Sequence, residues 1–346
     1  MTPASSRRPA IDIARGIAVM GMMVEHLIPT EGAPSQLGRL VNTASGWFTG
    51  RSAALFFVLA GMSWAIQMDQ RPSAGDHQWY VLRRAVALIA VGCILHLTVW
   101  PTEVLIAIGC ALPIATFVRR GKDRAVWIVL VVIVFSIPFV GNIARPWVAQ
   151  DWNDAGEPLL NWSTCFRLVF FDGCYPLMPW LAFVFAGMVA IQVQSRRILW
   201  FTGAAAVVSF VLVGVHQLQP AIESPFAIEW VPTSIPFLLV CGGAAFAVMF
   251  GIEALPQKVA TSSVSEWLGC FGRMSLTHYI GHILLVVLPM RQWYPAEEWP
   301  TRIGVIAMVG YLIIAIPFSV LWLRRFYRGP IEWTLSKFVG SERDGG

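Results

Sequence analysis

The chain has 346 residues, of which 56% are hydrophobic and only 13% are Asp, Glu, Lys or Arg. A soluble domain carries about 25% charged residues, so this composition excludes an ordinary cytosolic enzyme, a disordered tail and a nucleic-acid-binding domain. The net charge of +5 comes from basic residues in short loops, which is typical of a membrane protein.

Ten apolar segments follow one another along the chain, each close to the roughly 20 residues that a helix needs to cross a bilayer core about 30 Å thick. They predict an all-α, polytopic membrane bundle of about ten transmembrane helices, or eleven at most. The segments cover residues 9–28, 50–68, 84–100, 102–118, 125–142, 176–194, 198–216, 234–253, 266–289 and 303–323. No soluble domain interrupts them, so residues 1–346 are predicted to form a single membrane domain.

The distribution of basic residues predicts the orientation. Eighteen of the 25 Lys and Arg residues fall in the segments on the side of the N-terminus, six fall on the opposite side, and Arg273 lies within the ninth apolar segment. Because basic loops stay in the cytoplasm, both termini are predicted to be cytoplasmic. Residues 324–346 would then form a cytoplasmic tail and residues 143–175 an extracytoplasmic loop of a multi-pass protein in a bacterial inner (plasma) membrane.

The first apolar segment carries four ionisable residues, Asp12, Arg15, Glu25 and His26. Arg15 and His26 are eleven positions apart, which places them on one helix face about 16 Å apart along the axis. Charged side chains in a bilayer are costly and often mark function. Two structural interpretations stay open: a salt bridge between Asp12 and Arg15 at the inner interface, and a hydrogen-bonded, purely structural His26.

The ninth segment is interrupted by polar residues, with His278 and His282 four positions apart and therefore on one helix face. That spacing suits a metal, but neither an HExxH pattern nor a carboxylate partner accompanies it, so no metal is expected. Hydrogen bonding between helices is the alternative role for these side chains.

Two further groups of residues are noteworthy. Arg51 lies at the edge of the second segment, and Asp172 and Tyr175 precede the sixth. Cys165 and Cys174 share the predicted outer loop, where a disulfide is a reasonable expectation.

Phosphate-loop, nucleophile-elbow and CxxC motifs are absent from the sequence, which argues against ATP-driven transport by this chain alone.

The opening segment, IDIARGIAVMGMMVEH, resembles the first span of integral-membrane acyltransferases, which begin with a D-x-x-R-G-x-A pattern. Bacterial membrane O-acyltransferases have an Arg and a His at the spacing of Arg15 and His26. Later segments are similar to the YeiB-like family and to the related heparan-α-glucosaminide N-acetyltransferase catalytic domain: GRSAALFFVLAGMSWAI, YPLMPWLAFVFAGM, GRMSLTHYIGHI and RRFYRGPIEW.

This resemblance implies a bundle of ten or eleven spans that takes an acyl group, typically acetyl, from coenzyme A at the cytoplasmic side. The acceptor would be a sugar hydroxyl or amine reached from the other side. In the lysosomal enzyme the reactive His lies in the loop after the first span. Residues 28–50 here contain no His, so His26 is the one candidate that the resemblance supplies.

These expectations assign roles within a cavity walled by the first, second, sixth and ninth segments. His26 would be the general base or the nucleophile, with Asp172 as its catalytic partner or as an acceptor contact. Arg15 would bind acetyl-CoA, assisted by Arg83, Arg84, Arg119 and Arg120. The acceptor-binding residues would be Arg51, Tyr175, His278 and His282. The expected partners are membrane lipid and a small-molecule or glycan acceptor, with no nucleic acid, and a homodimer is left open.

A different class of function fits the same composition. Ten spans with intramembrane Arg and His also suit a transporter or flippase for a small solute or lipid-linked sugar, although the internal repeat common in transporters is not evident. A non-catalytic partner in an envelope complex is a third reading. The sequence identifies neither the acceptor nor the acyl group.

Overall fold

The computed structural model describes residues 8–29, 35–70, 74–100, 102–120, 123–144, 166, 168–192, 234–294 and 299–340, together with the single positions 204, 207, 208 and 211. Of these residues 87% are helical, and none of them lies in a strand. The predicted all-α class is therefore confirmed for the part of the chain that the structure describes.

Most helices coincide with predicted apolar segments. Their bounds are α1 Pro9–Leu27, α2 Gln36–Gly46, α3 Arg51–Asp69, α4 Ala74–Thr98, α5 Leu105–Arg120, α6 Asp123–Ala144, η2 Leu168–Asp172 (π-helical), α8 Leu177–Gln192, α10 Ile235–Glu253, α11 Gln257–Ala260, α12 Ser263–Arg273, α13 Ser275–His282, η3 Ile283–Val287 (π-helical), α14 Leu288–Trp293, α15 Thr301–Arg325 and α16 Pro330–Val339. The short helix α2 follows the first segment and was not predicted. The seventh predicted segment, 198–216, lies almost wholly outside the described residues.

Four of the described helical stretches are long and apolar enough to cross a membrane: Gln36–Asp69, Gln78–Thr98, Ile235–Glu253 and Thr301–Arg325. A fifth is added if the bent pair Ser263–Arg273 and Ser275–Trp293 is one span. These helices agree with a membrane protein, because a span needs about 20 apolar residues. The count of ten spans stays a prediction.

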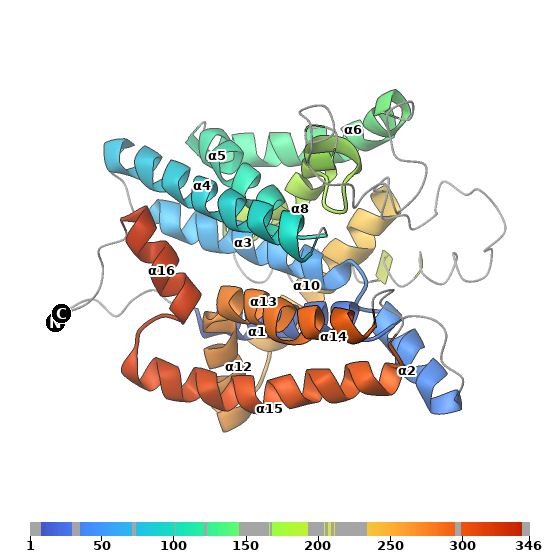
Figure 1. Ribbon diagram of the computed structural model, residues 1–346. Coiled ribbons are helices and arrows are strands. Elements are labelled where there is room, and N and C mark those ends of the chain that lie inside the picture. Colours follow the sequence, from blue (N-terminus) through green and yellow to red (C-terminus); the bar gives the residue numbers. More distant parts are fainter. Residues whose placement is uncertain are drawn as a thin grey trace. The chain divides into compact units, whose positions relative to one another are not determined.

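The described chain divides into two compact units. Unit 1 comprises residues 1–52 and 248–334, and unit 2 comprises residues 53–247 and 335–346. The first unit therefore combines two segments that are far apart in the sequence, with α1 packed beside α12 and α15 (Figure 1).

Helix α1 is packed at both ends through glycines that allow backbones to touch. A Cβ atom at Gly272 of α12 would collide with the carbonyl oxygen of Asp12, and one at Gly16 would lie 2.6 Å from the carbonyl oxygen of Leu268. At the other end, a Cβ at Gly304 of α15 would collide with the carbonyl oxygen of Leu27. Small residues at such crossings are the usual means of close helix packing in a membrane.

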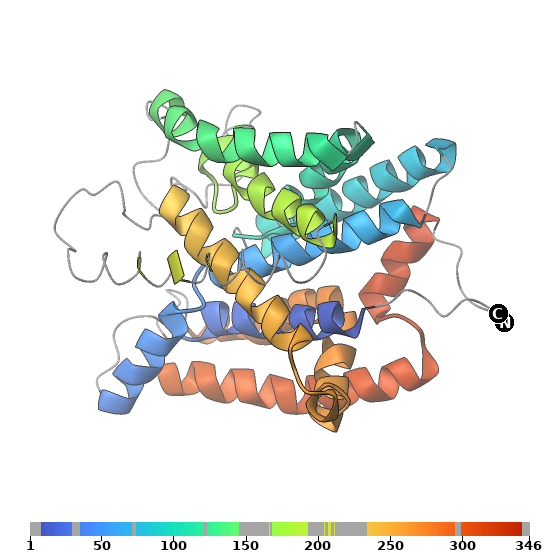
Figure 2. The same ribbon diagram turned by 180° about the vertical axis from the view of Figure 1, so that it is seen from behind.

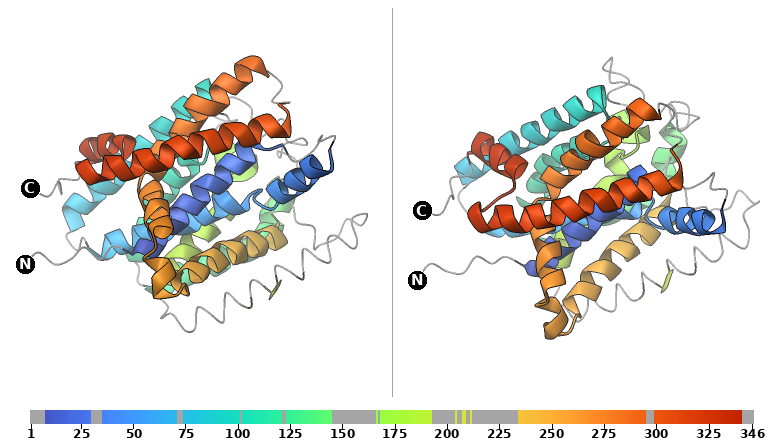
Figure 3. Two further views of the ribbon diagram at one scale, coloured as in Figure 1. Left: turned by 90° about the horizontal axis from the view of Figure 1, so that it is seen from below. Right: turned by 60° about the horizontal axis from the view of Figure 1, so that its bottom comes forward.

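The ninth predicted segment is not one straight helix, and the prediction of a continuous span over 266–289 is wrong in this respect. The chain bends by 74° between α12 and α13, so that α12 runs across α15 while α13 and α14 run alongside it (Figures 1 and 3). The bend frees the first N–H groups of α13, which need new acceptors.

The carboxylate of Glu332, on α16, supplies those acceptors. Its Oε1 accepts hydrogen bonds from the backbone N–H groups of Leu276 (2.7 Å) and Thr277 (3.1 Å), and its Oε2 accepts one from the Thr277 hydroxyl (2.5 Å). The C-terminal helix thereby caps the helix that carries His278 and His282, and this cap stabilises the bend.

Glu332 is expected to make stability depend on pH. Burial raises the pKa of this carboxyl above its ordinary value of 4.5, against the lowering effect of the Thr277 hydrogen bonds. As the pH rises, the unfolded chain loses the Glu332 proton at a lower pH than the folded chain does. The contribution of protonated Glu332 to the free energy of unfolding is therefore complete below pH 4.5 and is lost as the pH rises through the folded pKa. Tryptophan-fluorescence melts in detergent should show an unfolding temperature that falls above pH 4.5 in the wild type and less so in Glu332→Gln. Parallel curves for the two proteins would contradict this assignment.

Unit 2 is built on the hairpin of α4 and α5 and on close crossings of α3 with α8 (Figure 2). A Cβ at Gly61 of α3 would collide with the carbonyl oxygen of Val184, and one at Gly187 of α8 with that of Val58. At the hairpin turn, Glu103 accepts hydrogen bonds from the N–H groups of Leu105 and Ile106 and so caps α5.

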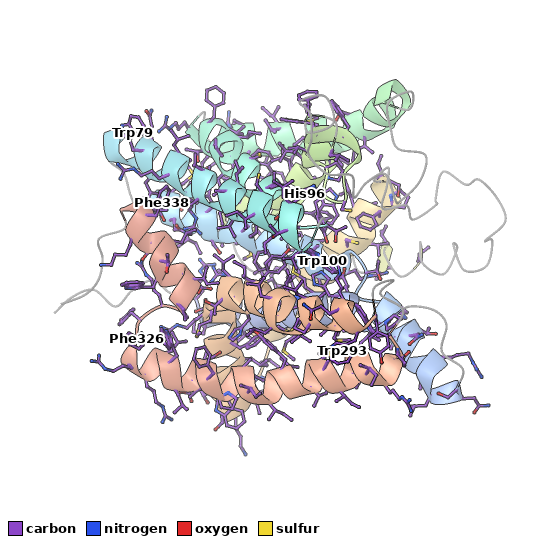
Figure 4. All side chains as sticks on the ribbon, in the orientation of Figure 1. Trp79, His96, Trp100, Trp293, Phe326 and Phe338 are labelled. Atoms are coloured by element: carbon purple, nitrogen blue, oxygen red, sulfur yellow. The ribbon has the colours of Figure 1, made fainter. Side chains whose placement is uncertain are left out.

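Exposed aromatic residues lie near opposite ends of α15 in unit 1. Trp293, at the end of α14, and Phe326, just after α15, project from the surface (Figure 4). Between them, α15 exposes Ile306, Ile313, Ile314 and Leu321. An apolar face bounded by aromatic residues is typical of a lipid-facing helix with interfacial anchors.

Candidate functional site

The last turn of α1 carries His26, and a residue just before α15, Trp299, holds that turn in place. The indole Nε1–H of Trp299 donates to the carbonyl oxygen of Leu27 at 2.8 Å, satisfying one of the free carbonyls at the helix end. Glu25, the neighbour of His26, points elsewhere and accepts a hydrogen bond from the N–H of Gly50 at 3.3 Å. The last turn therefore presents His26 in a defined position.

His26 meets His282 of α13. The Nδ1 atom of His26 lies 2.8 Å from Nε2 of His282, and the two rings are nearly parallel, with an interplanar angle of 19°. The sequence predicts His26 as a catalytic residue and His282 as an acceptor contact, and it does not predict that the two touch. Both belong to unit 1, and His282 is completely buried.

The two histidines of α13 have different environments. Nδ1 of His282 lies 2.9 Å from the carbonyl oxygen of His278. The His278 ring is itself held on both sides, with Nε2 2.6 Å from the Ser319 hydroxyl and Nδ1 3.1 Å from the Tyr311 hydroxyl, and it stacks on Phe271. His278 thus connects α13 to α15, and its predicted role in acceptor binding stays a prediction.

Arg291 also interacts electrostatically with His26. The sequence did not point to it, because it lies nine residues after His282 and nine residues of α-helix amount to two and a half turns, which is the opposite face. The π-helical segment η3 lies between them and changes that register. Glu332 was missed as well, since helical spacing carries no signal for a cap supplied by a separate helix.

At the other end of α1, Arg15 and Asp12 form a salt bridge of 2.7 Å, which is the contact that the structural interpretation of this pair expected. Asp12 is buried and Arg15 partly exposed. Arg15 and His26 remain eleven residues apart on one helix, about 16 Å along the axis. Arg51 donates to the Trp47 carbonyl oxygen at 2.9 Å and lies over the Trp47 ring.

The four other predicted coenzyme-binding arginines lie in unit 2. Arg84 donates to Gln67 and to the Tyr80 hydroxyl, each at 3.1 Å. Arg119 forms an ion pair of 2.7 Å with Asp69. Arg83 and Arg120 are exposed.

Tyr175, also in unit 2, is buried against the Trp180 ring. Asp172 ends η2, but its side chain is outside the described residues, as is Cys165. The roles predicted for Asp172 and Tyr175, and the disulfide between Cys165 and Cys174, therefore stay predictions.

Comparisons with known proteins agree with the resemblance that the sequence suggests. Residues 7–220 match the family described as heparan-alpha-glucosaminide N-acetyltransferase, catalytic, and residues 183–340 match a family described as a protein of unknown function, DUF418. The chain is 23% identical to the uncharacterized protein YxaH of Bacillus subtilis, with 96% of this chain and 94% of the relative covered. It is 31% identical to the uncharacterized protein YeiB of Escherichia coli over 43% of this chain and 42% of that one.

No solved structure matches the chain significantly. The match over residues 7–220 covers well over half of the 346 residues. It includes α1 with Arg15 and His26, two of the residues on which the acyltransferase resemblance rests. The chain therefore belongs to the family of the heparan-alpha-glucosaminide N-acetyltransferase catalytic domain.

Proposed function

We propose that this protein is an integral-membrane acyltransferase that moves an acetyl group from acetyl-CoA, bound at the cytoplasmic side, to a hydroxyl or amine of a sugar or envelope glycoconjugate. The observation that carries the proposal is the imidazole of His26, held by His282 at the end of α1 in a membrane protein of this acetyltransferase family. Imidazole can accept a proton, or hold an acyl group, near neutral pH.

The proposal includes a topology. About ten spans with both termini in the cytoplasm, in the cell membrane of a bacterium, would place the Arg15 end of α1 near the cytoplasmic surface and the His26 end near the outer surface. The charge distribution of the loops supports this orientation. Membrane lipid is the surrounding solvent, and a homodimer is compatible with the proposal.

Thioester transfer needs either a base for the acceptor or a nucleophile for the acyl group. In the first route, His26 takes the proton of the acceptor as the acceptor attacks the thioester carbonyl. In the second, His26 attacks first and carries the acetyl group to the acceptor. Arg15 would bind a phosphate or carbonyl of the coenzyme, since a guanidinium donates several hydrogen bonds in a planar array.

A direct test uses the purified protein in lipid vesicles with isotope-labelled acetyl-CoA and a glycan and glycolipid extract of its own host membrane. Mass spectrometry should find one component that gains the mass of a labelled acetyl group, and the same component should lack acetyl in a deletion strain. Release of coenzyme A without any acetylated component, or transport of a solute without coenzyme A release, would overturn the proposal and favour a carrier.

Arg15 is expected to contribute to coenzyme affinity. Hydrogen bonds to a charged group contribute about 1.5–3 kcal/mol, so Arg15→Gln should weaken acetyl-CoA binding roughly 10- to 100-fold. Isothermal titration with a non-hydrolysable thioether analogue of acetyl-CoA measures this directly.

The control for this substitution is the double variant Asp12→Asn/Arg15→Gln, because Arg15→Gln alone leaves Asp12 buried without its ion-pair partner. If Arg15 binds the coenzyme, affinity stays weak in the double variant. Affinity restored to the wild-type value would show that Arg15 serves only Asp12.

A further inference from the structure

The contacts of His282 decide which of its ring nitrogens carries hydrogen. Nδ1 lies 2.9 Å from the carbonyl oxygen of His278. A carbonyl oxygen only accepts hydrogen bonds, so Nδ1 of His282 must be the donor. In neutral imidazole one nitrogen is a donor and the other an acceptor. Nε2 of His282 is therefore an acceptor.

The same reasoning extends to His26. Its Nδ1 lies 2.8 Å from Nε2 of His282, which accepts, so Nδ1 of His26 must donate. The lone pair of neutral His26 is consequently on Nε2. A carbonyl oxygen on α13 thus sets the tautomer of a histidine on α1, through one intervening imidazole.

These hydrogen bonds run from His278 through His282 to His26, and the ring of His278 is held in place by α15. The Ser319 hydroxyl donates to the carbonyl oxygen of Ala315 at 2.7 Å, so it accepts from Nε2–H of His278 at 2.6 Å. The Tyr311 hydroxyl then donates to Nδ1 of His278. With both of its nitrogens engaged by α15, His278 keeps its ring in place and offers the carbonyl of its own backbone to His282.

We infer that His282 is a positioning residue that keeps neutral His26 protonated on Nδ1, so that Nε2 of His26 is the reacting atom. This inference rests on the proposed function for its chemical meaning, but not for its geometry. Which imidazole nitrogen is protonated is generally set by the hydrogen bond that the other makes, and carboxylates or carbonyls commonly fill the role that His282 has here.

Both routes of acyl transfer then use the same lone pair. In the base route, Nε2 takes the acceptor's proton while the acceptor oxygen or nitrogen bonds to the thioester carbon, the C–S bond breaks, and the imidazolium returns its proton to the coenzyme A thiolate. In the nucleophile route, Nε2 bonds to the acetyl carbon and the thiolate leaves, and the acceptor then displaces the imidazole and gives its proton to the thiolate. In each route the positive charge on His26 is shared with His282 through the Nδ1–H hydrogen bond.

The tautomer can be measured without any substrate. The protein contains six histidines. With all of them labelled with nitrogen-15 in lipid vesicles, solid-state NMR distinguishes protonated from unprotonated ring nitrogens. Signals are assigned by their loss in His26→Gln and His282→Gln. The expected result is an Nδ1–H, Nε2-unprotonated ring for both His26 and His282. An Nε2–H ring at His26 in the wild type would overturn the inference.

Two variants of His282 test the consequence. His282→Gln keeps an acceptor oxygen for Nδ1–H of His26, whereas His282→Leu removes it. At metal sites, loss of the partner that orients a histidine typically costs 10- to 100-fold in activity. By the same orienting effect, His282→Leu should lower acetyl-CoA turnover by about 10- to 100-fold and lose the uniform Nδ1–H state of His26. His282→Gln should keep that state and lose less turnover. Equal turnover loss in the two variants, with Nδ1–H retained in both, would show a packing role only.

The NMR and turnover measurements distinguish a failure of the positioning inference from a failure of the proposed function. If the NMR signals are as expected but the protein releases no coenzyme A with any membrane extract, the positioning inference stands and the proposed function is wrong. If the protein acetylates a component while His26 is Nε2–H, the function stands and the inference is wrong. His96→Gln, on α4 in unit 2, is the matched control, with wild-type signals expected for His26 and His282.

Discussion

Replacing His26 with Gln should lower acetyl transfer by about 10²- to 10⁴-fold, the usual contribution of a positioned acid–base group. The amide of Gln can still donate a hydrogen bond to Nε2 of His282, so the contact between α1 and α13 is preserved. What the variant lacks is a lone pair that takes a proton near neutral pH. The measurement is the initial rate of coenzyme A release with the membrane acceptor extract, at saturating acetyl-CoA.

His96→Gln is the control for this experiment as well, since it makes the same substitution at a histidine of α4 that is not part of the contact between His26 and His282. It should retain the wild-type rate. Retention of the wild-type rate by His26→Gln would remove His26 from the reaction. In that case Arg291, which interacts electrostatically with His26, would mark the region in which to look for another group.

The second large effect is structural and concerns Gly272. Its Cα faces the backbone carbonyl of Asp12, and backbone atoms cannot rotate away as a side chain can. Gly272→Val should therefore force α12 away from α1. Overpacking costs about 1–3 kcal/mol and sometimes more, so we expect a clear drop in the apparent unfolding temperature and in the yield of monodisperse protein in detergent.

Gly310→Val on α15 is the matched control, because a Cβ at Gly310 meets no atom within 4 Å. It should keep the wild-type unfolding temperature. Fluorescence-detected size-exclusion chromatography before and after heating compares the two variants. Similar unfolding temperatures for Gly272→Val and Gly310→Val would contradict the close packing of α1 against α12.

Many of the helices were predictable because the bilayer core offers the backbone no hydrogen-bond partners. A backbone in hydrocarbon must satisfy its own hydrogen bonds, so long apolar segments become helices, and the described helices α1, α3, α10 and α15 begin and end close to the predicted limits. The pairing of Asp12 with Arg15 follows from local spacing, since residues three apart on a helix are neighbours. The prediction of the helices is wrong where one apolar segment is bent, as at Met274 between α12 and α13.

Residue order alone established a helical membrane protein, the acyltransferase resemblance, and His26 as a polar group that must find a partner within the bilayer. Only the tertiary structure decided which partner it finds. Helical periodicity relates residues a few positions apart, whereas His26 and His282 are 256 positions apart and meet because glycine contacts bring α12 against α1 and a cap from α16 stabilises the bend before α13. The physical reason is that an imidazole withdrawn from water requires some hydrogen-bond partner, while the identity of that partner depends on how distant helices pack.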